Sequence, residues 1–238
     1  MKKYFDKIRE IILDCLFPQI CASCLMDLDK SEKQNNICKK CASRIEIFDS
    51  FLCGVCRSRL PDNKKTCHKD AKYILGSASN FDNQIVQKII KNLKYEKRSE
   101  NSKALAYLLQ SFIIRSNFNF QDFILIPIPI HKNKEKLRGF NQTELIADEL
   151  SKLIGVKVLK NILFKVRDTD SQTKMEDYKS REINIENSFS IKSNDLIKDK
   201  NIIILDDVTT SGATLKETSR VLKKSGVKKI IALVVAKT

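Results

Sequence analysis

Beyond residue 70 the chain alternates between short segments rich in strand-forming residues and segments with helical spacing. The pattern predicts strands at residues 73–81, 123–130, 156–163, 202–205 and 227–235, of which 202–205 is a continuous apolar run typical of a buried parallel strand. Between them, apolar positions recur every three or four residues, which predicts helices at residues 84–94, 104–115, 141–153 and after residue 214. Strands that alternate with helices form mostly parallel sheets with right-handed crossovers. The pattern therefore predicts an α/β fold, a mostly parallel sheet flanked by helices.

The run at residues 202–205 leads into the most informative segment of the chain. Two carboxylates, Asp206 and Asp207, follow it directly. Small and hydroxyl residues then surround one glycine: Thr209, Thr210, Ser211, Gly212, Ala213 and Thr214. Ligands of α/β sheets bind beyond the carboxyl ends of such strands, and the first turn of a helix offers unpaired N–H groups to phosphate. Carboxylates for sugar hydroxyls or a metal, beside a phosphate-binding turn, suit a phosphorylated ribose.

Two other interpretations of this segment are an ordinary turn and a nucleotide-binding site. Two aspartates after a strand are common in turns, and Ser211 or Thr210 can serve as an ordinary helix N-cap. A magnesium-binding acidic strand end of a P-loop nucleotidase requires a G-x-x-x-x-G-K-[ST] loop elsewhere in the chain. The six glycines contain no pair at that spacing and no G-x-G-x-x-G. The nucleotidase and dinucleotide-binding interpretations are therefore excluded.

Seven of the eight cysteines lie between residues 21 and 67. Two C-x-x-C pairs come first: Cys21, Cys24, Cys38 and Cys41. Two such pairs predict a closed, structural, tetrahedral zinc site, and their closeness argues against redox chemistry by one pair. A second set is incomplete, with Asp70 where a fourth cysteine would stand: Cys53, Cys56, Cys67 and Asp70. Either Asp70 or His68 can close a second zinc site, and decay of this set into loosely packed thiols stays an alternative.

Charge and size narrow the class of protein. The net charge of +15 and the pI of about 9.4 favour polyanionic partners such as nucleic acid, phosphate-bearing substrates or anionic lipid. No run reaches the ~18–20 apolar residues of a transmembrane helix. We expect a cytoplasmic protein, with attachment to the inner membrane surface left open. We predict two parts. Residues 1–70 form an N-terminal helix and a cysteine-rich zinc module that is too small for a core of its own, and residues 71–238 form the α/β domain.

Three further segments carry candidate chemistry. Residues 126–142 (IPIPIHKNKEKLRGFNQ) place a cationic loop after a strand, where Arg138 can clamp a second phosphate group with two N–H bonds. Lys94 ends a basic helical stripe with Lys88 and Lys91, which a solvated lysine face explains equally well. Residues 167–189 form a long polar stretch of the kind that covers active sites.

Together these motifs resemble the ComF family (ComFC type), proteins linked to DNA uptake in naturally competent bacteria. The sequence ILDDVTTSGAT at residues 204–214 is similar to the phosphoribosyl pyrophosphate (PRPP) motif of type I phosphoribosyltransferases. The cysteine pairs, LFP-x-x-C, LKY, PIPIH, RGFNQ, R-x-T-x-x-Q and R-x-x-N complete the resemblance from residue 16 to the C-terminus. The chain departs from the family at Asp70 and in the Lys/Asn-rich stretch before Arg138.

The resemblance implies a type I phosphoribosyltransferase-like domain that binds PRPP with Mg²⁺. It implies that Asp206 and Asp207 contact the ribose hydroxyls and that residues 209–214 hold the 5′-phosphate. From the chemistry of the segment we further expect Arg138, together with Lys94, to stabilise departing pyrophosphate. The expected partners are PRPP, single-stranded DNA and other DNA-uptake proteins. Because no segment identifies an acceptor, enzymatic turnover stays open. The alternatives are a single-stranded DNA-binding competence factor with a non-catalytic PRPP pocket, and a nucleobase-salvage phosphoribosyltransferase.

Overall fold

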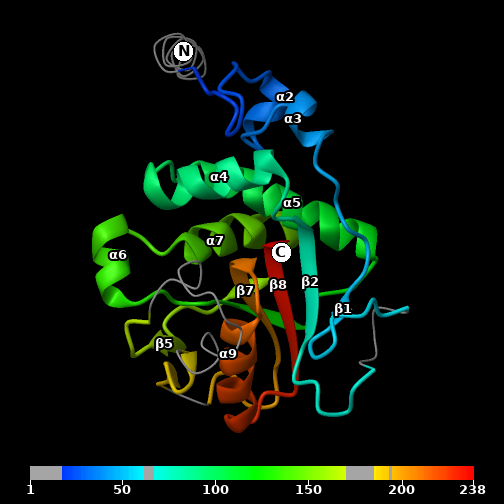
Figure 1. Ribbon diagram of the computed structural model, residues 1–238, viewed down its shortest axis with the longest axis vertical. Coiled ribbons are helices and arrows are strands. Elements are labelled where there is room, and N and C mark those ends of the chain that lie inside the picture. Colours follow the sequence, from blue (N-terminus) through cyan, green and yellow to red (C-terminus); the bar gives the residue numbers. More distant parts are fainter. Residues whose placement is uncertain (1–17, 62–66, 170–184, 193–194) are drawn as a thin grey trace, which may run out of the picture.

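The computed structural model describes residues 18–61, 67–169, 185–192 and 195–238. Within them the chain builds one six-stranded sheet, whose order is β1-β2-β8-β7-β3-β4 (Figure 1). The strands are β1 (Leu52–Cys53), β2 (Ile74–Asn80), β3 (Phe123–Pro127), β4 (Lys157–Val158), β7 (Asn201–Thr209) and β8 (Lys229–Lys237). All neighbours pair in parallel except β1, which runs antiparallel to β2. The expected α/β fold with a mostly parallel sheet is confirmed.

Helices cover both faces of this sheet. One face packs against α4 (Gln84–Tyr95), α5 (Asn101–Ser116) and α7 (Gln142–Ile154). The other face packs against α9 (Ala213–Lys224) and against a hairpin of β5 (Leu163–Lys165) and β6 (Phe189–Ile191). In β7 the side chains alternate between the faces, so that Ile203 and Leu205 join the first core and Ile202 and Ile204 the second.

The cysteine-rich segment extends the first of these cores. Its two short helices, α2 (Lys30–Lys33) and α3 (Lys39–Ala42), lie beyond α4 and α5 in Figure 1. Ala22, Leu28 and Ile37 belong to the same buried cluster as the inner side chains of α4 and α5. The Asn36 side-chain amide donates to Asn101 Oδ1 at 3.3 Å, which ties the segment to the first turn of α5. The segment therefore shares its core with the sheet domain.

The structure corrects three local expectations. The strand expected at 123–130 ends at Pro127: Ile128 N–H still donates to Leu205 O at 2.9 Å, but Pro129 carries no N–H to continue the ladder. The strand expected at 156–163 is split into β4 and β5, with Asn161 in a left-handed turn at φ 59° between them. The expected cationic loop is a helix, α6 (Lys132–Arg138). His131 is its N-cap, with Nδ1 accepting a hydrogen bond from Asn133 N–H, and Gly139 is its C-cap in the left-handed conformation, φ 88°.

Candidate functional site

The two aspartates lie at the carboxyl end of β7, next to each other and on alternating faces of the sheet. Asp207 follows Ile203 and Leu205 toward α4, whereas Asp206 follows Ile202 and Ile204 toward α9 and the β5–β6 hairpin. Asp206 Oδ1 accepts from Asp207 N–H at 2.8 Å, which fixes its orientation. The site therefore has two halves that meet at this strand end.

Lys94 occupies the Asp207 half. Its ammonium group, at the end of α4, pairs with the Asp207 carboxylate, and the two side chains are only 19% and 6% exposed. Lys88 and Lys91 lie closer to solvent on the same helix, so Lys94 does not share the solvated face that its spacing predicted. The LKY motif thus supplies a cation to the strand end.

Asp206 has a different environment. Burial, and then the charge of Asp207, raise the pKa of its carboxyl above the ordinary value of 3.8. Lys165 on β5 faces the same region, and burial together with the charge of Lys134 lowers its pKa to about 8, although Asp206 opposes that shift. A carboxylate under these conditions is stabilised by an additional cation. This half of the site therefore fits a divalent metal ion, which would hold Asp206 ionised.

The turn after β7 has the geometry of a phosphate cradle. Gly212 is the N-cap of α9 in the left-handed conformation, φ 80°, and Ser211 Oγ accepts from Ala213 N–H at 3.3 Å. The twelve-residue helix then begins at Ala213. Residues 209–214 thus wrap the positive end of the helix dipole at the end of the strand that carries both aspartates.

Arg57 reaches this turn from the cysteine-rich segment, although no motif in the sequence singles it out. Arg57 Nη2 donates to Ser211 O at 3.3 Å, 154 residues along the chain. A Cβ built on Gly212 would lie 1.9 Å from Arg57 Nη2, so only glycine leaves room for this approach. No pattern in the sequence links the segment after Cys56 with the turn after β7.

Arg138 lies at the end of α6 beside the LKY motif. Its Nη1 donates to Gln142 Oε1 at 2.8 Å, and its guanidinium lies 5.5 Å from the centre of the Tyr95 ring. The RGFNQ motif ends α6 at Gly139 and begins α7 with an N-cap, because Asn141 Oδ1 accepts a hydrogen bond from Thr143 N–H at 3.2 Å. The fold brings Arg138 close to the segment that carries Lys94.

A cavity of about 600 Å³ lies beyond the end of β3, next to the Asp206 half. Residues from β3, α6, α7 and the hairpin line it, among them Pro127, His131, Asn141, Lys165 and Ser190. The expected cover at 167–189 lies only partly in the described residues, and its Gln172, Lys179, Arg181 and Asn184 lie outside them. In its described start, Asp168 Oδ2 accepts from the Asn133 side chain at 3.0 Å, which ties this start to α6.

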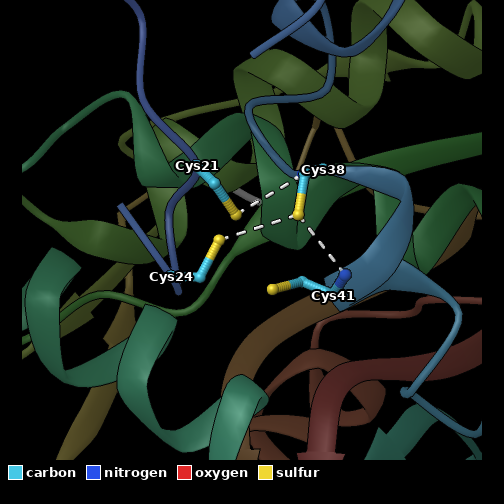
Figure 2. A group of neighbouring side chains, drawn as sticks. All are labelled: Cys21, Cys24, Cys38 and Cys41. Carbon is cyan, nitrogen blue, oxygen red and sulfur yellow. Dashed lines mark hydrogen bonds between the residues drawn. The ribbon is translucent and has the colours of Figure 1, made fainter. Parts of the chain in front are cut away.

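The first cysteine group converges as its spacing predicted. Figure 2 shows Cys21, Cys24, Cys38 and Cys41 with their sulfur atoms gathered around one common point. All four sulfurs lie within 4.8 Å of one another, and Cys24 Sγ and Cys38 Sγ are 3.7 Å apart. Tetrahedral zinc with bonds of about 2.3 Å holds its sulfurs roughly 3.8 Å apart. The four cysteines therefore fit a zinc ion.

The thiol electrostatics of this group favour a cation as well. Burial raises the pKa of Cys21, but the N–H groups of Cys38, Ser23 and Cys24 outweigh it and lower the pKa to about 7. Burial and the neighbouring sulfurs raise the pKa of Cys41 to about 12. The Cys21 thiolate therefore forms readily, whereas a bound cation would be needed to ionise the Cys41 thiol.

The second cysteine group closes with His68 in place of Asp70. Cys53, Cys56, Cys67 and His68 offer ligand atoms within 4.8 Å of one another. His68 Nδ1 lies 3.2 Å from Cys67 Sγ and 3.5 Å from Cys53 Sγ. Burial raises the pKa of Cys53, but the N–H groups of Cys56 and Val55 outweigh it and lower the pKa to about 6. Three sulfurs and one imidazole are a ligand set that zinc accepts.

Comparison with known proteins bears on the C-terminal part of the chain. The profile of the "Phosphoribosyl transferase domain" family matches residues 142–238, which include the turn after β7. A hypoxanthine phosphoribosyltransferase of Staphylococcus aureus aligns over 64% of this chain and 63% of its own, at 14% identity with a TM-score of 0.32, a likeness too low to bear on function. The fold and site thus define a phosphoribosyltransferase-like domain.

The relatives that match most of the chain are competence and DNA utilization proteins. Competence protein F of Haemophilus influenzae is 27% identical over 209 residues, which cover 83% of this chain and 88% of that protein. Competence protein ComFC of Bacillus subtilis is 26% identical, covering 87% of this chain and 79% of its own. DNA utilization protein YhgH of Escherichia coli K12 is 26% identical, covering 88% and 92%. Over most of its length the chain is therefore similar to competence proteins of the ComF type, and its C-terminal part matches a phosphoribosyl transferase domain.

Proposed function

We propose that this chain binds PRPP with Mg²⁺ at the end of β7 and acts in DNA uptake during natural transformation. One observation carries the binding proposal: Asp206 and Asp207 directly precede a left-handed Gly212 turn at the start of α9. The 5′-phosphate takes the turn of residues 209–214, and the ribose hydroxyls contact the two carboxylates. The role in DNA uptake rests on the ComF and "DNA utilization" relatives.

The cations around the strand end are assigned to the pyrophosphate group of PRPP. Lys94 beside Asp207 and Arg138 beside Tyr95 are placed to neutralise a pyrophosphate group. Bound Mg²⁺, which Asp206 would help to hold, would supply further positive charge at this end of the strand. Burial of Asp206 keeps the carboxylate in a weakly screened position, where its charge acts strongly on an oxocarbenium-like ribose. Zinc at the first cysteine group, Cys21, Cys24, Cys38 and Cys41, is structural in this proposal, because four ligands leave no open position.

Calorimetry with PRPP and Mg²⁺ tests the binding site. We expect the double variant Asp206→Asn with Asp207→Asn to lose Mg²⁺-dependent binding, because both ribose contacts and the cation's partners are removed. Asp122→Asn is the matched control, since this exposed aspartate precedes β3 and lies outside the site. Unchanged affinity in the double variant, with the control also unchanged, would refute the assignment. Release of pyrophosphate, screened against nucleobases and single-stranded DNA, then decides between turnover and binding.

A second function, binding of single-stranded DNA, is favoured by the surface next to the site. Tyr95 is 71% exposed with the Arg138 guanidinium over its ring, and Lys88 and Lys91 lie on the same helix. A stacking platform beside lysines is a common way to hold single strands. Oligonucleotide affinity that falls steeply with salt and drops in Tyr95→Ala supports this function, and salt-independent affinity contradicts it.

The cysteine chemistry bears on where the protein works. Both cysteine groups are arranged for metal ions, as is usual in reducing compartments, and we therefore place the protein in the cytoplasm. In the described part of the chain no helix is long and apolar enough to cross a membrane.

A further inference from the structure

Arg57 is a side chain of the cysteine-rich segment that touches the turn after β7. It is half-buried, and its Nη2 donates to Ser211 O at 3.3 Å. The guanidinium covers Gly212 so closely that a Cβ there would lie 1.9 Å from Nη2, and 3.3 Å from Tyr73 Oη. A full positive charge therefore lies against the turn that the proposed function assigns to the 5′-phosphate.

The backbone around Arg57 is held by the second cysteine group. Arg57 has a left-handed backbone, φ 62°, and its N–H donates to Cys53 O at 3.0 Å. Cys53 N–H in turn donates to Ser58 O at 2.9 Å, which closes the turn. The preceding residue, Cys56, has its sulfur 3.2 Å from Cys67 Sγ. A metal ion bound by this group would thus fix both ends of the turn from which the Arg57 side chain projects.

We propose that Arg57 is a ligand of the ribose 5′-phosphate and that the second cysteine group, loaded with zinc, positions it. The inference rests on the proposed function, because it assigns one more residue to the same phosphate site. A helix N-terminus offers only partial charges, whereas a phosphate dianion is held best with full cations. A guanidinium carries five N–H donors and the bond to Ser211 O uses one, which leaves donors for a bidentate grip on phosphate.

The arrangement couples metal loading to ligand affinity. With the metal bound by Cys53, Cys56, Cys67 and His68, the turn keeps Arg57 over Gly212. Without it, the turn loses its cross-link and the guanidinium spends less time at the phosphate site. Zinc loading of the second cysteine group would therefore change the affinity for the ribose 5-phosphate half of the ligand and leave the pyrophosphate half unaffected.

Calorimetry on the full chain with three probes tests this assignment: PRPP, ribose 5-phosphate and pyrophosphate, each with Mg²⁺. Arg57→Ala should weaken ribose 5-phosphate and PRPP by about 10- to 100-fold, the range of a lost hydrogen bond to a charged group. Pyrophosphate affinity should stay within about twofold of wild type. Arg59→Ala is the matched control, because Arg59 lies two residues away and pairs with exposed Asp49 at 3.2 Å. Cys56→Ser with Cys67→Ser should lower the zinc content and reproduce the Arg57→Ala pattern.

The outcomes separate this inference from the function on which it rests. If the wild-type chain binds neither PRPP nor ribose 5-phosphate, the proposed function fails. If wild type binds and Arg57→Ala matches Arg59→Ala, Arg57 is no phosphate ligand. If Arg57→Ala weakens all three probes equally, the residue acts on the fold and the inference is overturned. If the cysteine variant loses zinc yet binds ribose 5-phosphate normally, the metal does not position Arg57.

Discussion

Loss of the Lys94 ammonium should destabilise the chain more than loss of a surface lysine. In Lys94→Met the Asp207 carboxylate, 6% exposed, is left at the edge of the first core without its cation. Removal of one partner of a buried ion pair costs about 3–5 kcal/mol. Because Lys94 itself is 19% exposed, water can compensate in part, and we expect about 3 kcal/mol.

The size of the effect can be checked by thermal and urea unfolding. For a chain of this length, about 3 kcal/mol corresponds to a fall in Tm of roughly 6–12 °C. The double variant Lys94→Met with Asp207→Asn removes both charges and should return to within about 1 kcal/mol of wild type. A coupling of about 2 kcal/mol in this double-mutant cycle would locate the effect in the ion pair.

A surface pair in the same protein provides the control. Lys160 Nζ lies 2.7 Å from Asp148 Oδ2, and both side chains are more than a third exposed. Lys160→Met should cost less than about 1 kcal/mol, as exposed pairs do. If Lys94→Met costs no more than Lys160→Met, or if the double variant is as unstable as Lys94→Met, the buried pair does not stabilise the strand end as argued.

Three other changes test the site. Gly212→Ala should lower stability by about 1–2 kcal/mol and weaken PRPP binding, because φ 80° disfavours an L side chain and the new Cβ would displace Arg57; calorimetry and unfolding measure both effects. Asp206→Asn should stabilise the ligand-free chain at pH 8 by about 1–2 kcal/mol, and the gain should vanish near pH 4. The sign follows from the raised pKa of the Asp206 carboxyl in the folded chain: it favours folding at low pH, and this contribution is lost as the pH rises above 3.8. A stability gain of Asp206→Asn that does not depend on pH would contradict this reasoning. Cys24→Ser should lower the bound zinc measured by atomic emission and reduce Tm, and full zinc retention would remove the first metal site.

The strand end and its turn could be predicted from sequence because their signals are local. The apolar run before Asp206, and a glycine among hydroxyls before a helix, are contiguous in the chain, and the structure places β7 and α9 there. Helix α6 escaped prediction because Leu137 is its one apolar side chain and is exposed, so no amphipathic pattern marks it. Its signals were the cap at His131 and the stop at Gly139.

The contacts between distant segments could not be predicted. Lys94 shares helical spacing with Lys88 and Lys91, and only the placement of the α4 C-terminus over β7 separates it from them. The choice of His68 over Asp70 depends on how the chain turns after Cys67, which a C-x-x-C spacing does not specify. Arg57 lies 154 residues from Ser211, and no periodicity relates the two.

The alternation of side chains in β7 connects the proposed phosphate site with the two cysteine groups. Because Asp206 and Asp207 leave the strand toward opposite faces, cations must reach the site from both sides of the sheet. Lys94 comes from α4, which shares its core with the segment held by Cys21 and Cys41. Arg57 comes from the turn held by the second group. Each cysteine group would then support one half of the ligand, so loss of the first should weaken pyrophosphate binding and loss of the second ribose 5-phosphate binding.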